Sequence, residues 1–233
     1  PNWEHIRAAR QRVFRYAAIC NHIANAGGWG ELPGNDFYMV AGGSSAGDAH
    51  WQAVTFIHEL GHNLGLHHGG GDGVNRKPNY ISVMNYAFHD YRDTNNTKLF
   101  PDFSQEALLP LIEDNLDETI GLTSMYSTDV YALHGYRNPG EQPQWGWVQL
   151  NSNQFDWNRD GQFEQGVIVD LNWVPTNGPS PGETMNGFND WPTIVANLPI
   201  GTTGSYADGQ HIPPPHDEET YEEVAERQAL IPP

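Results

Sequence analysis

The feature that most constrains this chain is the stretch HELGHNLGLHH, residues 58–68, which gathers four histidines and a glutamate. His58 and His62 are four residues apart, so on a helix both side chains project from one face, about one turn apart. Two imidazoles at that spacing suit a tetrahedral zinc ion. The stretch therefore predicts a helix that carries two ligands of one metal ion.

A third ligand is expected just after this helix. Gly65 interrupts the run, and glycine readily adopts the left-handed conformation that ends a helix. The chain can then turn and bring His68 back to the metal, whereas a continuing helix would carry His68 away. His67 is the competing third ligand, but only His68 has the offset of the pattern H-E-x-x-H-x-x-G-x-x-H. Glu59, next to the first ligand, can hold a water molecule on the metal without binding the metal itself.

This extended pattern resembles the metzincin clan of zinc endopeptidases. Members of that clan have a methionine-containing turn, the Met-turn, beneath the metal, and this chain has SVMNY at 82–86. The resemblance implies that Met84 is the methionine of the turn. It also implies that Tyr86 is a further zinc ligand, which swings to stabilise the transition state. Taken alone, Met84 would be interpreted as an ordinary core methionine and Tyr86 as a surface aromatic residue.

The resemblance also implies an α+β fold, a metzincin-like catalytic domain over residues 1–200. We expect a long zinc-binding helix and a small sheet in an upper part, residues 1–68. A loop-rich lower part, residues 69–200, would carry the Met-turn. Residues 201–233 are predicted to form a Pro-rich linker and a short acidic helix. Gly69 follows the third histidine where better-known subfamilies have Asp, Glu, Ser or Pro, so no subfamily is assigned.

Local patterns predict further elements. Apolar residues at helical spacing indicate one long helix before the zinc-binding helix, and Asp48 is a suitable N-cap for the zinc-binding helix itself. Short apolar runs between turn residues favour strands. The other predicted elements are the long helix at 2–28, a strand at 36–43, a short helix at 105–116 capped by Ser104, and a strand at 166–174.

A second stretch, DWNRDGQFE at 156–164, has the spacing that begins an EF-hand-type calcium loop. Oxygen-bearing side chains stand at positions one, three and five, and glycine at position six. Val167 replaces the usual glutamate at position twelve, so Glu164 or Asp170 would close the ligand shell. The alternative is an Asx-rich turn without metal. The candidate ligands of a structural calcium ion are Asp156, Asn158, Asp160, Glu164 and Asp170.

Composition limits the partners. A net charge of −18 argues against a nucleic-acid partner, and 11 Lys and Arg are too few for a basic membrane-binding patch. No apolar run is long enough to span a membrane. The chain has 1 cysteine, so an internal disulfide cannot form. We expect Cys20 to be buried as a small hydrophobic residue and not to serve in latency.

We therefore expect a secreted, monomeric zinc metalloendopeptidase that acts on protein or peptide substrates. Zinc held by three imidazoles lowers the pKa of its bound water to about 7, and Glu59 would serve as general base and then general acid. By resemblance, Tyr86 would donate a hydrogen bond to the oxyanion. The alternatives are a zinc-containing protein- or glycan-binding module without turnover, and a zinc hydrolase of a non-peptide bond. The presence of Glu59 argues against the first, and the resemblance at Met84 and Tyr86 against the second.

Overall fold

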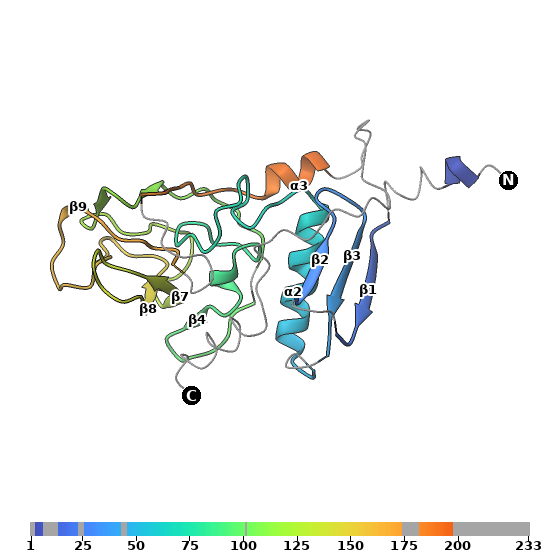
Figure 1. Ribbon diagram of the computed structural model, residues 1–233, viewed down its shortest axis with the longest axis horizontal. Helices are drawn as coiled ribbons and strands as arrows, with labels where there is room; N and C mark the ends of the chain where they lie inside the picture. Colours follow the sequence, from blue (N-terminus) through green and yellow to red (C-terminus); the bar gives the residue numbers. More distant parts are fainter. Residues whose placement is uncertain are drawn as a thin grey trace. The chain divides into compact units, whose positions relative to one another are not determined.

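The computed structural model describes residues 3–6, 14–22, 26–42, 46–100, 102–173 and 182–197. The chain divides into two compact units, and each is described by itself. Unit 1 comprises Pro1–His67 and Trp191–Pro233, and unit 2 comprises His68–Asp190. The described residues form a mixed structure with few helices and several small sheets, which agrees with an α+β class (Figure 1).

The sheet of unit 1 has three strands, β1 (Tyr16–Cys20), β2 (Gly28–Gly30) and β3 (Asp36–Val40), in the order β1-β3-β2. β1 runs parallel to β3, and β2 runs antiparallel to it. Helix α2 (Ala49–Asn63) packs along β2 and β3 (Figure 1). The strand expected at 36–43 is therefore present as β3, the central strand of this sheet.

The long helix predicted over 2–28 is wrong where β1 forms. Residues 3–6 are helical, but Tyr16–Cys20 is extended and pairs along its whole length with β3. The amide of Tyr16 also donates to the carbonyl of Asn35 at 2.7 Å. A short apolar run suits a strand as well as a helix, and here pairing with a distant strand decides. Outside the described residues lie 7–13 and 23–25 of this stretch, and the predicted linker and acidic helix of 201–233.

Helix α2 begins and ends at capping residues. The Asp48 carboxylate accepts a hydrogen bond from the amide of Trp51 at 3.0 Å, which satisfies a free amide of the first turn. At the other end Gly65 has a φ of +88°, and its amide donates to the carbonyl of His62 at 2.8 Å. The amide of the next residue donates to the carbonyl of Gly61 at 3.0 Å. These two bonds form a Schellman cap, which ends the helix and redirects the chain.

A second helix of unit 1, α3 (Trp191–Asn197), completes this cap. The side-chain amide of Asn197 donates to the carbonyl of Leu64 at 2.9 Å, so a carbonyl at the end of α2 gains a partner. A Cβ at Gly65 would lie 2.4 Å from Nδ2 of Asn197. Gly65 is thus required twice, for its backbone angle and for the space that Asn197 fills.

Unit 2 is built of short antiparallel strands. Its largest sheet has the order β4-β7-β8, and two further pairs are β10 with β5 and β6 with β9. Their bounds are β4 Arg92–Asp93, β5 Leu111–Ile112, β6 Leu116–Asp117, β7 Val130–Tyr136, β8 Gln144–Gln149, β9 Gln165–Val167 and β10 Thr184–Met185, with a 3-10 helix η2 at Tyr86–Phe88. The core of the unit packs around Phe88, Leu116, Leu150 and Met185.

The helix predicted over 105–116 is wrong, because β5 and the start of β6 occupy its second half. Ser104 does not cap a helix, since its hydroxyl donates to the carbonyl of Glu106 at 2.8 Å. The buried Glu113 explains the difference. Its carboxylate accepts hydrogen bonds from the amides of Leu171 at 2.7 Å and Glu183 at 3.0 Å. These long-range bonds outweigh the local helical pattern.

The strand predicted over 166–174 is shorter than expected. β9 ends at Val167, after which Asp170 forms only an isolated bridge with Arg137. Among the residues that the structure describes, no helix has the length and apolar character needed to cross a membrane.

Candidate metal centre

Two buried histidines of α2 meet on one face of the helix. The rings of His58 and His62 lie edge to face with centroids 4.8 Å apart, and their Nε2 atoms are 3.2 Å apart. Nδ1 of His62 lies 2.8 Å from the carbonyl oxygen of Leu66. Because a carbonyl can only accept, Nδ1 of His62 carries the proton and Nε2 keeps its lone pair. His62 is therefore oriented as a neutral metal ligand.

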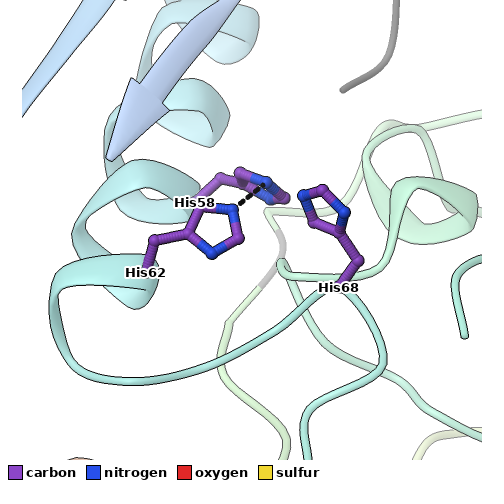
Figure 2. A group of neighbouring side chains, drawn as sticks. All are labelled: His58, His62 and His68. Carbon is purple, nitrogen blue, oxygen red and sulfur yellow. Dashed lines mark hydrogen bonds between the residues drawn. The ribbon is translucent and has the colours of Figure 1, made fainter. Parts of the chain in front are cut away.

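His68 brings a third imidazole to this point. Figure 2 shows His58 and His62 projecting from α2 toward His68, which follows the turn at Gly65. Ligand atoms of the three side chains all lie within 4.8 Å of one another, and all three residues are buried. His67 is exposed and is not part of the group. A buried set of three imidazoles is consistent with zinc.

A buried lysine holds the chain directly after His68. Nζ of Lys77 donates to the carbonyls of Gly69 at 2.7 Å and Asn186 at 2.8 Å, and to the carboxylate of Asp72 at 3.0 Å. Burial lowers the pKa of Lys77, while the neighbouring Asp72 opposes that shift. Lys77 has no sequence signal, because its partners come from separate parts of the chain.

Met84 is completely buried, on a segment held by a buried carboxylate. The amide of Met84 donates to Oγ of Ser82 at 3.1 Å, and that hydroxyl donates to Asp190 at 2.6 Å. The hydroxyl of Tyr80 and the amide of Ser104 also donate to Asp190, each at 2.7 Å. Burial raises the pKa of Asp190, and these three hydrogen bonds oppose the shift. Asp190 has no local sequence signal, because its partners are distant in the chain.

Tyr86 lies beside the third histidine. Its hydroxyl is 3.2 Å from Nε2 of His68, and the two ring centroids are 4.7 Å apart. Tyr86 is buried, so it is not the surface aromatic residue that its position in the sequence alone would suggest. Its hydroxyl therefore lies at a ring nitrogen of the third histidine.

Glu59 occupies a space that two glycines of β2 leave for it. A Cβ at Gly28 would lie 2.4 Å from Oε1 of Glu59, and a Cβ at Gly30 would lie 2.6 Å from its carbonyl oxygen and 3.3 Å from Oε2. Glu59 is only 1% exposed. Gly28 and Gly30 alternate along the strand, so both face the helix. The carboxylate is therefore confined against β2, a constraint that the sequence motif did not reveal.

The candidate calcium loop is closed by its own hydrogen bonds. The Asp156 carboxylate accepts from the amides of Asp160 at 3.2 Å and Gly161 at 2.8 Å, and Gly161 has a φ of +87°. Oδ1 of Asn158 accepts from the amide of Asp160 at 3.0 Å. These are the contacts of an Asx-rich turn. The three histidines are the one metal-binding group found among the described residues, so calcium binding at this loop stays a prediction.

A buried glutamate organises the same loop. The carboxylate of Glu118 accepts from the amides of Trp157 at 2.7 Å, Asn158 at 3.1 Å and Glu164 at 3.3 Å. Asp170 pairs with Arg137, its carboxylate 3.5 Å from the guanidinium. Glu118 was not among the predicted site residues, since it stands far before the loop in sequence.

Cys20 lies in β1, where it is partly buried and its thiol donates to the carbonyl of Met39 at 3.3 Å. The expected burial of Cys20 is therefore only partial.

Comparison with known proteins adds one finding. A family model described as Peptidase M66 matches residues 8–88. The match includes α2, the three histidines and the segment that carries Met84 and Tyr86. No curated protein and no solved structure matches the chain. The family match and the histidine group together support a metallopeptidase-type function.

Proposed function

We propose that this chain is a secreted, zinc-dependent endopeptidase of the metzincin type. The observation that carries the proposal is the buried group of His58, His62 and His68, with Glu59 beside the first of them. The Peptidase M66 match supports a peptidase. Secretion rests on the metzincin resemblance alone.

Each residue of the group has a stated task in this proposal. His58, His62 and His68 would hold the zinc ion. Bound zinc polarises a carbonyl group and makes a water molecule acidic near neutral pH. The carboxylate of Glu59 would accept the proton of the attacking water and later deliver it to the nitrogen of the leaving amine. Tyr86 would donate a hydrogen bond from its hydroxyl to the oxyanion that develops on the substrate carbonyl.

The substrate would bind as an extended strand along β2. This strand is at the end of the order β1-β3-β2, so one of its edges is not paired within the sheet. An extended peptide can add to such an edge through main-chain hydrogen bonds. Because Gly28 and Gly30 pack against Glu59, a peptide on β2 would pass close to the general base. This placement favours cleavage of internal bonds over removal of single terminal residues.

The proposal is tested by cleavage of unfolded casein and of a mixed peptide library, with zinc measured on the same preparations. Wild type, Glu59→Gln and chelator-treated wild type would be compared. We expect about one zinc per chain in wild type and in Glu59→Gln, and proteolysis only in untreated wild type. Near-normal cleavage by Glu59→Gln would contradict the role of Glu59. Zinc binding without cleavage of any substrate would favour a binding module.

A further inference from the structure

Arg76 has an unusual conformation beside the candidate site. Its φ is +58°, a left-handed conformation that costs energy for a residue with a side chain. Arg76 is only 7% exposed, although arginine is rarely buried. Its guanidinium carbon lies 5.7 Å from the centroid of the Tyr86 ring, within the range of a cation–π contact. The strained backbone thus places a cation over the ring face of Tyr86.

Asn75 ties this conformation to Tyr86 through the backbone. Oδ1 of Asn75 accepts from the amide of Arg76 at 2.7 Å and from the amide of Tyr86 at 3.3 Å. The carbonyl of Asn75 accepts from the side chain of Asn172 at 3.4 Å. One side-chain oxygen therefore joins the residue that carries the guanidinium to the residue that carries the phenol. Tyr86 is therefore held at two points: the guanidinium contacts the face of its ring, and Asn75 accepts from its backbone amide.

We propose that Asn75 and Arg76 are positioning residues that hold the hydroxyl of Tyr86 at His68, and that they act on turnover through Tyr86. This inference rests on the proposed function, because it assigns Tyr86 a part in peptide hydrolysis. The guanidinium restricts the swing of the ring, and its positive charge strengthens the phenol as a hydrogen-bond donor. Neither Asn75 nor Arg76 needs to touch the substrate.

The chain contains a matched control for Arg76. Arg159 also has a left-handed backbone, with a φ of +62°, and its guanidinium carbon is also 5.7 Å from a tyrosine ring, that of Tyr136. The hydroxyl of Tyr136 instead donates to Oε1 of Gln144 at 3.1 Å. Asparagine tolerates the left-handed conformation better than most residues, so Arg76→Asn and Arg159→Asn remove a guanidinium with little added backbone strain.

The kinetic test compares these variants on one peptide substrate in the zinc-loaded enzyme. We expect Arg76→Asn to lower kcat about tenfold with little change in KM, and Arg76→Lys to recover part of that loss. Arg159→Asn should keep kcat within about twofold of wild type. In a Tyr86→Phe background, Arg76→Asn should lower kcat by less than about twofold further, because the group through which it acts is gone. The same tenfold loss in that background would overturn the proposal, as would a rise in KM alone.

A second readout does not depend on activity. NMR spectra of the metal-free protein would be recorded with ¹³C-labelled tyrosine rings. The protein has 10 tyrosines, and the signal of Tyr86 is identified as the one that disappears in Tyr86→Phe. Arg76→Asn should shift or broaden the Tyr86 signal and leave that of Tyr136 in place, and Arg159→Asn should do the reverse. An unchanged Tyr86 signal in Arg76→Asn would overturn the positioning role. If wild type cleaved no peptide, the proposed function would fail, and these spectra would still decide whether Arg76 holds the ring.

Discussion

The ammonium of Lys77 lies 3.0 Å from the carboxylate of Asp72, whose side chain is 38% exposed, and it holds the residue that directly follows the last of three clustered histidines. The side chain of Lys77 is completely buried, and its other two partners are backbone carbonyls. Without the ammonium, Asp72 can still be solvated, but the carbonyls of Gly69 and Asn186 lose their donor, and a buried acceptor without a partner costs stability.

We predict that Lys77→Met destabilises the protein and weakens zinc binding. The substitution keeps the length of the side chain but leaves Asp72 and two carbonyls without their donor. The expected loss is about 2 kcal/mol in the free energy of unfolding of the metal-free protein, measured by urea denaturation. Lys98→Met is the control, because Lys98 is partly exposed and its buried partner Asp90 keeps a second cation, Arg92, at 3.4 Å, so the expected loss is about 1 kcal/mol or less. Equal effects of the two substitutions would contradict the prediction.

Gly28→Ala should displace the general base while sparing the metal. The new Cβ would stand 2.4 Å from Oε1 of Glu59, and the buried carboxylate would have to move. We expect kcat to fall more than about tenfold at unchanged zinc content, because catalysis by a carboxylate depends on its placement to within about 1 Å. Gly27→Ala provides the comparison, since a Cβ at Gly27 would meet nothing within 4 Å. Full activity of Gly28→Ala would show that Glu59 is not confined by β2.

The features that could be predicted from sequence are those with local signals. Asp48 caps α2 through an amide three residues away, and Gly65 ends it through bonds to the same turn. The turn at Gly65 is sufficient to bring His68 back toward the two histidines of α2. These interactions are complete within a short segment, so residue types and their spacing are sufficient to indicate them.

The features that escaped prediction depend on distant partners. The segment Tyr16–Cys20 becomes a strand only because β3 pairs with it. Asp190 receives the hydroxyl of Tyr80 from 110 positions away, and Lys77 reaches the carbonyl of Asn186 over 109. No periodicity in a single sequence encodes such pairs. The structure is needed to find them.

Gly65→Ala should reduce zinc affinity through the helix cap. Alanine is strained at a φ of +88°, and its Cβ would meet Nδ2 of Asn197 at 2.4 Å. The variant Gly140→Ala separates these two causes. Gly140 has a φ of +77° and open space around its Cβ position, so only the backbone cost of roughly 1–2 kcal/mol applies. We expect Gly65→Ala to lose more stability than Gly140→Ala in thermal unfolding, and only Gly65→Ala to lose zinc to a competing chelator. If Gly65→Ala and Gly140→Ala retained zinc equally, the helix cap would not contribute to zinc binding.

The stability of the metal-free protein should depend on pH through Glu113. Burial raises the pKa of this carboxyl from 4.5 to about 7. Between those values the folded protein keeps the proton and the unfolded chain releases it, so the contribution is complete below pH 4.5 and is lost as the pH rises to about 7. The loss is about 3 kcal/mol for a shift of this size. Metal-free protein is used so that zinc binding by the histidines does not add to the pH profile.

Glu113→Gln isolates that dependence. The amide resembles the protonated carboxyl, with one oxygen left to accept from the amide of Leu171 or Glu183. Urea denaturation of both proteins from pH 4.5 to 8 should therefore give similar stabilities at the acidic end, because Glu113 is then protonated in both states. Toward pH 8 the wild type should become less stable than Glu113→Gln by about 3 kcal/mol. A stability difference that does not change with pH would mean that Glu113 is already ionised in the folded protein at the acidic end, and that its two backbone donors outweigh its burial.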